Sequence, residues 1–425
     1  MGSAPRAGVR LARSIGGAIA RSGALLLAAA ATANAASIVD ATQWQLSLDV
    51  RAVGSDGRRS FLDGGLGALR YGANDSGIQL GRLRLALTQP FGSILALRLD
   101  ASSWGGREKN PFDLTEAYLE LRPYPRAGFR ARMRAGAFYA PISLENRAAG
   151  WESPYTLSYS AIDSWIAEEL RTIGVEAQVD WLGTRLGHDF DLALVGAAFG
   201  WNEPAGVSLA SHGFALDDRQ TPLFGRVGLP GAEPVAGFRE FREIDGRVGT
   251  YAGVEARWLD RFTLRALHYD NHADPASYDR AIGEHAWATH FDAVGARAES
   301  ADGWTAIFQW MQGETYVAPA GIGELEWPFR ARYLLAARQM GRHMLSVRYD
   351  EFEVDAEQPA ARGIQSGHAT TAAYVYAPSA RWRLTFEWLR VRSSQSNRRI
   401  FLGEMPLATE NLVQLAARYA VGGYL

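Results

Sequence analysis

The sequence predicts an all-β fold: a transmembrane, antiparallel, up-and-down β-barrel of about 16 strands. Apolar and polar residues alternate along some sixteen short segments, and the connections between these segments are alternately long and short. After residue 36 no run of 18 apolar residues could form a membrane-spanning helix. The composition agrees, because 45 Gly and 11% aromatic residues beside only 17 Pro are typical of a large sheet protein.

Residues 1–35 have the pattern of a secretory signal peptide. Four arginines without an acid precede the apolar core Ala24–Ala31, and the small residues Ala33 and Ala35 follow it. This core is too short to cross a bilayer of about 30 Å, whereas A-x-A suits a signal peptidase. The alternative is an uncleaved anchor helix. We therefore expect residues 36–425 to form an exported barrel in an outer membrane of the Gram-negative type.

The first predicted strand shows the pattern that the others repeat. Trp44, Leu46, Leu48 and Val50 alternate with polar residues, and successive side chains of a strand point to opposite faces. The corresponding segments follow at 83–87, 95–99, 117–121, 129–135, 175–181, 190–199, 254–258, 262–266, 294–298, 304–310, 329–335, 345–349, 369–377, 382–388 and 413–419. The seventh is less regular and the fourteenth is ambiguous. One face of each strand is expected to contact lipid and the other a polar lumen.

The connections support this topology. Long ones are predicted at about 52–76, 101–113, 139–171, 200–248, 270–286, 311–328, 350–367 and 391–411. Seven short turns alternate with them, as in outer-membrane barrels with both termini in the periplasm. Aromatic residues near the short turns and near the opposite strand ends predict two interfacial girdles: Phe91, Phe129, Trp181, Trp258, Phe262, Trp304 and Trp382, and then Tyr139, Trp201, Trp310 and Trp388.

A secreted soluble β-protein, such as a propeller or a lectin-like sandwich, is the alternative fold. Its connections would not separate into one long and one short set, and no internal repeat of 40 to 50 residues is present. Its core would also not carry a continuous charged face. The absence of Cys excludes disulfides and thiolate chemistry, and 44 basic against 46 acidic residues give no indication of nucleic-acid binding.

A barrel of sixteen strands is wide enough for an aqueous channel, so the predicted function is diffusion of small polar or anionic solutes. By parity, 17 arginines and 11 carboxylates point inward. Arg330, Arg332, Arg338 and Arg348 are counted among these arginines, and Asp350 and Glu387 among the carboxylates. The candidate pore-lining or solute-binding residues are Arg82, Arg84, Arg98, Glu116, Glu120, Arg130, Arg132, Arg134, Glu145, Arg147 and Asp163.

Arg130, Arg132 and Arg134 form the most distinctive pattern among these candidates. They lie on one face of a predicted strand, roughly 6.6 to 6.8 Å apart per two residues. Three guanidinium groups at this spacing would let an anion move from one donor to the next. The alternative is that they only pair with Glu116 and Glu120 on the neighbouring strand.

The connection 139–171 is rich in aromatic residues, so part of it is expected to fold against the lumen wall and to constrict the pore. Here the sequence resembles the outer-membrane porins selective for phosphate and polyphosphate. The resemblance rests on Gly136-Ala137-Phe138-Tyr139-Ala140-Pro141, then Glu145, and later Arg171-Thr172-Ile173-Gly174-Val175. It implies a sixteen-stranded porin, a homotrimer, whose third long loop folds inward.

The chain also departs from that family. Its loop holds five acidic residues against Arg147 and Arg171, contains no lysine, and no coiled coil precedes the first strand. An acidic loop opposite the arginines therefore predicts a mixed-field constriction for small polar solutes rather than phosphate specificity.

Other functions fit the sequence less well. The closest histidine pairs, His268/His272 and His285/His290, lack the H-E-x-x-H pattern, and no Ser and His suited to a barrel lipase share a face. We expect no enzymatic activity, metal or cofactor. An outer-membrane receptor or export channel remains the rival interpretation, because the connection 200–248 is long and carries Pro, Gly and mixed charge, as binding loops do.

Overall fold

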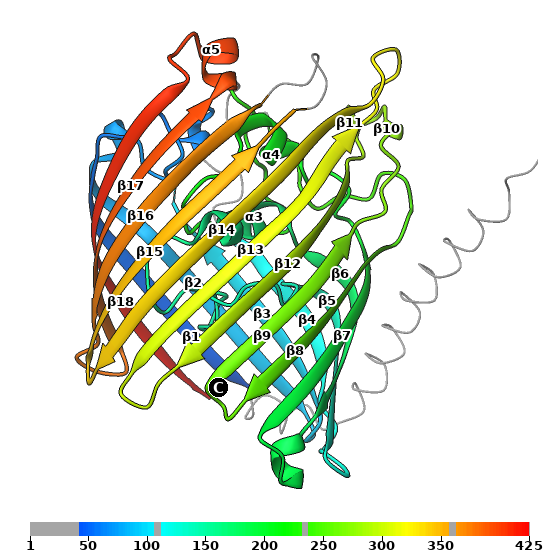
Figure 1. Ribbon diagram of the computed structural model, residues 1–425, viewed down its shortest axis with the longest axis vertical. Helices are drawn as coiled ribbons and strands as arrows, with labels where there is room; N and C mark the ends of the chain where they lie inside the picture. Colours follow the sequence, from blue (N-terminus) through cyan, green and yellow to red (C-terminus); the bar gives the residue numbers. More distant parts are fainter. Residues whose placement is uncertain (1–41, 106–111, 232–236, 357–362, 425) are drawn as a thin grey trace, which may run out of the picture.

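The protein is a closed antiparallel barrel of sixteen strands, which confirms the predicted fold class (Figure 1). The computed structural model describes residues 42–105, 112–231, 237–356 and 363–424. The predicted signal peptide, residues 1–35, lies outside the described residues. β1 pairs with both β2 and β18, and Gln43 at its start lies opposite Tyr424 near the end of the chain, which closes the ring.

Each strand of the barrel pairs with its neighbours in chain order. The barrel strands are β1 (Gln43–Ser55), β2 (Gly77–Phe91), β3 (Leu95–Ser103), β4 (Asp113–Leu121), β5 (Phe129–Phe138), β6 (Thr172–Trp181), β7 (Phe190–Gly200), β8 (Gly249–Trp258), β9 (Phe262–Asp270), β12 (Ala288–Glu299), β13 (Trp304–Val317), β14 (Leu325–Met340), β15 (His343–Val354), β16 (Gln365–Tyr376), β17 (Trp382–Gln395) and β18 (Leu407–Tyr424). A small hairpin of β10 (Tyr278–Asp279) and β11 (Glu284–His285) lies in the connection after β9.

Long and short connections alternate around the barrel, as predicted, except that the connection 318–324 is no longer than the short turns 122–128 and 182–189. At the long-loop end of the barrel, β13 and β14 extend further than predicted. Most of the predicted connection 311–328 is strand, because β13 continues to Val317 and β14 begins at Leu325. Ladder pairing between the two strands satisfies their backbone polar groups even beyond the apolar band.

The predicted inward and outward faces are confirmed in most strands. In β1, Leu46 and Leu48 are exposed on the outer wall, whereas Asp49 and Arg51 are buried in the lumen. The prediction was wrong for β14. Its apolar residues Phe329, Ala331, Tyr333, Leu335 and Ala337 face inward and are buried, and Arg330, Arg332 and Arg338 are exposed on the outer wall.

The girdle at the short-turn end is confirmed for five of its residues, which are exposed: Phe129, Trp258, Phe262, Trp304 and Trp382. At the opposite end, Trp310 and Trp388 point outward. Tyr139 was wrongly assigned to that girdle. It is buried inside the barrel, where its ring stacks on Trp151 at 4.1 Å and lies 3.4 Å from the guanidinium carbon of Arg171.

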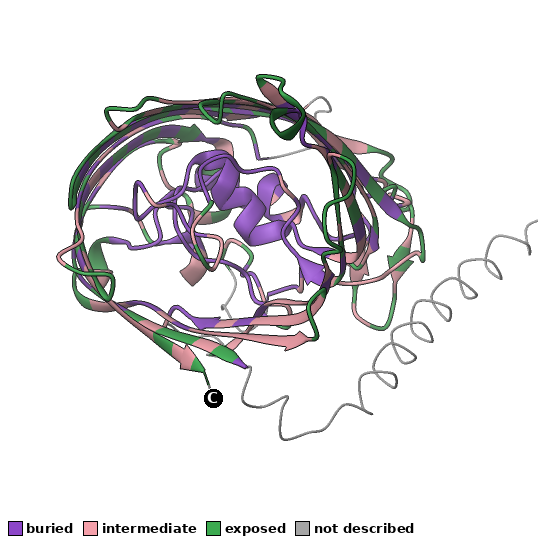
Figure 2. Ribbon diagram, turned by 90° about the horizontal axis from the view of Figure 1, so that it is seen from below, coloured by how far each residue is buried: buried purple, intermediate pink, exposed green. Residues whose placement is uncertain are grey.

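The hydrophobic core lies inside the barrel. Helices α3 (Ala161–Glu169) and α4 (Val207–His212) belong to long connections that fold into the lumen, and α3 packs against β14 and β15. Figure 2 looks into the barrel and shows buried helical segments inside the ring of strands. This packing explains the reversed face of β14: its apolar side chains cover α3, with Trp165 lying 4.9 Å from Phe329 between ring centres.

Shorter helices lie in other connections. They are the 3-10 helices η1 (Phe61–Asp63), η2 (Ala73–Asp75) and η3 (Gly183–Leu186) and the helix α5 (Ser396–Leu402). Within the described residues, none of the helices has the length and apolar character needed to cross a membrane.

Candidate functional site

The connection 139–171 crosses the lumen from one wall to the other. It leaves β5, and β15 lies eight strands from β5 in either direction around the sixteen-stranded ring. Ser346, Arg348 and Asp350 of β15 nevertheless all bond to this connection. The loop is therefore fixed across the full width of the barrel, and we call it the crossing loop.

Arg348 is the main anchor of the crossing loop. Its fully buried guanidinium pairs with Glu145 of the loop at 2.7 Å and with Asp350 of its own strand at 2.8 Å. It also donates to the carbonyl oxygens of Ser158 and Tyr159, both at 2.7 Å. A planar donor with several N–H groups can bind carboxylates and two consecutive backbone carbonyls at once.

Two carboxylates of the wall accept hydrogen bonds from loop backbone. Glu387 of β17 accepts from the N–H groups of Leu157 and Ser158 at 2.5 and 3.2 Å. Asp350 accepts from the N–H of Ala161 at 3.1 Å, at the start of α3. Ser160 caps the same helix, because its hydroxyl accepts from the N–H of Asp163. These bonds satisfy backbone donors that would otherwise be buried and unpaired.

The described part of the connection 201–248 also folds into the lumen and packs on the crossing loop. Tyr159 donates its N–H to the carbonyl of Asp217 at 2.9 Å, and Thr221 donates to Ala167 at 3.0 Å. The first long connection joins the same body, since Leu216 donates to Ala68 at 2.8 Å. We call this body of three packed loops the plug.

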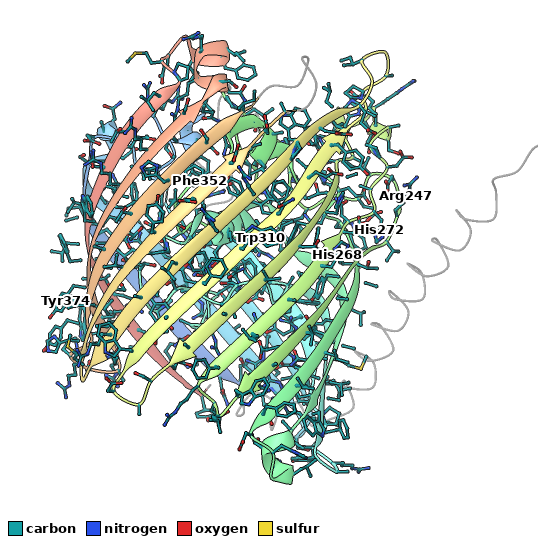
Figure 3. The ribbon with its side chains drawn as sticks, in the orientation of Figure 1. Arg247, His268, His272, Trp310, Phe352 and Tyr374 are labelled. Atoms are coloured by element: carbon teal, nitrogen blue, oxygen red, sulfur yellow. The ribbon has the colours of Figure 1, made fainter. Side chains whose placement is uncertain are left out.

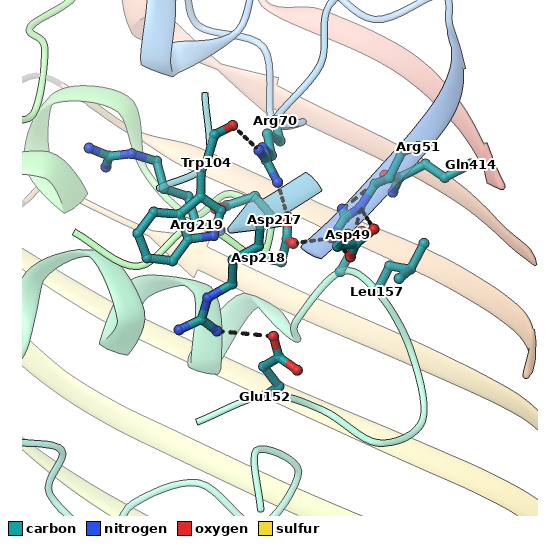
Figure 4. A network of polar contacts seen from close by, with 12 residues as sticks. Asp49, Arg51, Arg70, Trp104, Glu152, Leu157, Asp217, Asp218, Arg219 and Gln414 are labelled. Atoms are coloured by element: carbon teal, nitrogen blue, oxygen red, sulfur yellow. Dashed lines mark hydrogen bonds and ion pairs between the residues drawn. The ribbon is translucent and has the colours of Figure 1, made fainter. Parts of the chain in front are cut away.

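Ion pairs and hydrogen bonds connect the plug to β1 and β2 (Figure 4). Asp218 accepts from Arg51 of β1 at 2.5 Å and from Arg70 of the first connection at 2.9 Å. Burial alone would raise the pKa of Asp218, but the two guanidinium groups hold it below its usual range. Arg82 of β2 donates to the carbonyl of Gly150 at 3.0 Å and to Gln220 at 3.3 Å, so it holds two loops.

Several predicted site residues therefore anchor the plug. Arg82, Glu145 and Asp163 are buried, and the last two are fully enclosed. The pKa of Asp163 is raised well above its usual range by burial and by the neighbouring Glu145. In the crossing loop all five acidic residues, Glu145, Glu152, Asp163, Glu168 and Glu169, are at least nine-tenths buried. Arg147 is the exposed charge of this loop. The expected acidic, mixed-field surface is thus not formed.

The three arginines of β5 do not pair with Glu116 and Glu120 of β4, as the alternative interpretation supposed. Arg130 pairs with Asp180 at 2.5 Å, and Arg132 and Arg134 pair with Glu176 at 3.3 and 2.7 Å, all on β6. The two strands are in register, with each arginine opposite a polar residue of β6. Arg134 is buried, so only Arg130 and Arg132 reach open space.

Beside β3 to β5, at the short-turn end of the lumen, the arginines are exposed and their carboxylate partners are buried. The side chains of Arg98, Arg122, Arg130 and Arg132 expose 38%, 56%, 47% and 26%, against 4% or less for Glu120, Asp180 and Glu176. The pattern does not extend to β9 and β12, where Arg265 exposes 19% against 18% for Glu255, and Arg297 exposes 11% against 41% for Glu299. The lumen surface beside β3 to β5 is therefore cationic, although its arginines are paired.

A cavity of about 400 Å³ lies in the lumen beside β1 to β4. Its lining includes Gln45, Arg84, Arg98, Glu116 and Gly150. Arg84 donates to Gln45 at 2.6 Å and to Asp100 at 2.7 Å, and Glu116 accepts from the N–H of Tyr139 at 3.2 Å. The cavity thus combines three predicted site residues with the turn of the crossing loop at Gly150.

In the described residues, one group of acids brings ligand oxygens within 4.8 Å of one another: Glu203, Glu243 and Asp245, in the connection 201–248. Burial and the neighbouring Glu243 raise the pKa of Glu203 to about 9. His268, which was considered as a ligand, lies on the outer wall and pairs with Asp292 at 2.8 Å.

Sequence reasoning missed the anchors of the plug. Arg348, Asp350 and Glu387 were recognised as inward-facing, but not as residues that hold a loop. The connection 200–248 was considered only as a binding loop of the rival receptor or export channel, whereas Leu209, Phe214 and Leu216 lie in the core. Besides the aromatic residues of the connection 139–171, the apolar inward face of β14 was a signal that could have indicated a buried body inside the barrel.

Comparison with protein-family models and with curated protein sequences gave no match. Among solved structures the chain is similar to the outer membrane channel DcaP of Acinetobacter baumannii, with TM-score 0.52, 12% identity and coverage of 89% of this chain and 96% of that one. It is similar to a loop deletion mutant of OmpT, an outer membrane protein of Vibrio cholerae (0.51, 10%, 89% and 98%). Salmonella typhi OmpF in complex with daunomycin is similar to the same extent (0.50, 11%, 91% and 99%). At these identities the similarity concerns the fold.

Proposed function

We propose that the protein is an outer-membrane porin, a narrow diffusion channel that favours small anionic solutes. The proposal places the long loops outside the cell and the short turns in the periplasm, as in other barrels of this architecture. Residues 1–35 then act as the signal peptide that is removed on export.

One observation carries the anion preference. At the periplasmic end the lumen presents half-exposed guanidinium groups to water, whereas the carboxylates that pair with them are buried against the wall. A solute that passes β3 to β5 meets the positive partner of each of these pairs first. Arg147, the exposed charge of the crossing loop, adds one more positive group to this surface. Fixed charges within about 10 Å of a path are only partly screened at roughly 0.1 M salt.

The presence of the plug in the lumen favours a narrow channel, not a wide one. Three loops pack in the lumen around an apolar core that includes Leu69, Trp165 and Phe214. The cavity lined by Arg84, Arg98 and Glu116 lies between the crossing loop and β1 to β4, where a solute could pass. Selectivity would arise there and in the arginine-lined region below it.

The test is the reversal potential of the channel in planar bilayers under a salt gradient. The double variant Arg130→Gln/Arg132→Gln removes two exposed lumen charges and keeps Arg134, which holds Glu176. We expect the reversal potential to shift towards cations, and the shift to shrink as salt is raised.

The matched control is Arg330→Gln/Arg332→Gln, which removes the same charge from the outer wall. We expect wild-type selectivity from it. Equal shifts in the two variants, or none in either, would contradict the proposed anion path. Failure of the wild-type protein to conduct at all would favour the receptor or export interpretation.

We also propose that the channel assembles as a homotrimer. Vibrio cholerae OmpT, with TM-score 0.50 and 10% identity to this chain, has been solved in a trimer form. Native mass spectrometry of the protein extracted in mild detergent tests this proposal, and a monomer at all concentrations would contradict it.

A further inference from the structure

Three carboxylates meet at the long-loop end of the barrel, where the connection 201–248 leaves β7 and returns to β8. Glu203 follows the end of β7, and Glu243 and Asp245 precede the start of β8. One carboxylate oxygen from each of the three lies within 4.8 Å of the others. Arg247, which flanks this group in the sequence, is labelled in Figure 3 near the same end of the barrel. We call the three acidic residues the carboxylate cluster.

Backbone N–H groups hold each side chain of the carboxylate cluster in place. Glu203 accepts from the N–H of Asp245 at 2.9 Å, and Glu243 accepts from the N–H of Trp201 at 3.0 Å. Asp245 in turn accepts from the N–H of Arg247 at 2.8 Å. The donors come from both ends of the connection 201–248. The positions of the ligand oxygens are therefore set by the backbone on both sides.

Glu203 is the buried member of the cluster, and one of its oxygens has no partner. The residue is 2% exposed. Its Oε2 accepts from the N–H groups of Ile244 and Asp245, whereas its enclosed Oε1 has no hydrogen-bond donor in the described part of the chain. Among the described residues neither Glu203 nor Glu243 forms an ion pair, and Nε of Arg247 lies 4.0 Å from Asp245. A buried carboxylate oxygen of this kind costs free energy until a positively charged ligand binds to it.

We propose that the carboxylate cluster binds a calcium ion. Ca²⁺ takes carboxylate, carbonyl and water oxygens at about 2.3 to 2.6 Å and accepts irregular arrangements of them. Oε1 of Glu203 supplies the buried ligand, and the side chain of Asp245, which is 3% exposed, supplies a second. Glu243 is partly exposed, so water reaches the remaining positions. Mg²⁺ fits this group less well, because it requires a near-ideal octahedron and loses its water reluctantly.

Calcium at this position joins the two ends of a connection that forms part of the plug. Described residues between the ligands, such as Leu209 and Phe214, lie in the core of the barrel. Asn202, next to Glu203, donates to the carbonyl of Glu169 at 2.7 Å and accepts from the hydroxyl of Tyr269 at 2.8 Å. The ion is thus connected through one residue to the end of α3 and to β9, and it fixes the plug to this side of the wall.

The test is terbium luminescence of the full protein in detergent, after divalent cations have been removed with EDTA. Tb³⁺ occupies calcium sites and emits when a nearby tryptophan is excited. Two tryptophans bond to the cluster through their backbone: Trp201 donates to Glu243 at 3.0 Å, and Trp287 donates to the carbonyl of Glu203 at 2.7 Å. We expect saturable emission from the wild type, and we expect Ca²⁺ to displace Tb³⁺ at lower concentrations than Mg²⁺ does.

The variant Glu203→Gln/Asp245→Asn removes two charged ligands. It should bind Tb³⁺ roughly tenfold more weakly or worse, because the affinity of calcium sites follows the number of charged ligands. The single variant Glu243→Gln changes the partly exposed ligand and should also weaken binding. The matched control is Glu351→Gln/Glu353→Gln, which removes two carboxylates from the outer wall of β15 and should bind like the wild type.

Four outcomes would overturn the proposal. They are wild-type emission that Ca²⁺ does not displace, displacement by Mg²⁺ at lower concentrations than by Ca²⁺, equal loss in the control, and unchanged affinity in a folded double variant. The first of these would indicate that Glu203 and Glu243 share a proton instead of a cation. If the double variant does not fold, unchanged affinity in Glu243→Gln is the refuting result. These measurements involve no conductance, so the calcium site and the proposed function can fail separately.

Discussion

Replacing Arg348 by methionine should release the crossing loop from β15. The substitution leaves Glu145 and Asp350 buried without their cation, and it removes the donor to the carbonyls of Ser158 and Tyr159. Breaking a buried ion pair by removing one partner costs about 3 to 5 kcal/mol. The barrel wall keeps its ladder hydrogen bonds, because the backbone of β15 remains paired with β14 and β16. We therefore expect the loss to appear as displacement of the plug, not as opening of the barrel.

Single-channel conductance in planar bilayers measures this displacement, and we expect it to rise. Limited proteolysis should cut the crossing loop in the variant and not in the wild type. The control is Arg330→Met, whose exposed ion pair with Glu353 should contribute no more than about 1 kcal/mol. Adding Glu145→Gln to Arg348→Met should restore part of the lost stability, because one unpaired charge is then removed. Unchanged conductance together with unchanged protease resistance would refute the reasoning that Arg348 holds the loop.

Three further outcomes are expected from the same geometry. Phe386→Arg places a charge on the apolar outer wall and should lower the folded fraction in vesicles, by roughly 2 to 4 kcal/mol if the site lies near the midplane, as urea titration would show. Burial and the neighbouring Glu168 raise the pKa of Glu169 to about 7, so the folded protein retains a proton that the unfolded chain releases above about pH 4.3. The free energy of unfolding, and with it the thermal unfolding midpoint, should therefore fall as the pH rises from about 4.3 to 7. In the variant Glu169→Gln the midpoint should lose this part of its pH dependence. Gly150→Val should lower conductance, because Gly150 has φ 73° and a Cβ there would lie 2.4 Å from Nε of Arg84, at the cavity.

The sequence was sufficient to predict the barrel. Period-two alternation assigns side chains to two faces, and in a membrane a sheet of such strands must close, since unpaired edges cannot be hydrated there. The lengths of the connections then showed which strand ends lie together at each end of the barrel. Local motifs also identified the crossing loop, because an aromatic-rich connection of this length needs a surface to pack on. These properties follow from residues that are close in sequence.

Only the tertiary structure decided what the inward face contacts. In β14 the run Phe329 to Leu335 was assigned to lipid, yet these residues pack on α3. An apolar side chain has the same pattern whether lipid or a buried helix covers it, so alternation alone cannot separate the two environments. The same holds for charge. Arg130 and Arg348 both follow the inward parity, but one is half-exposed and the other is enclosed by loops from distant parts of the chain. Which arginines meet solute depends on how three long connections pack together, and contacts between segments so far apart leave no periodic signal in the sequence.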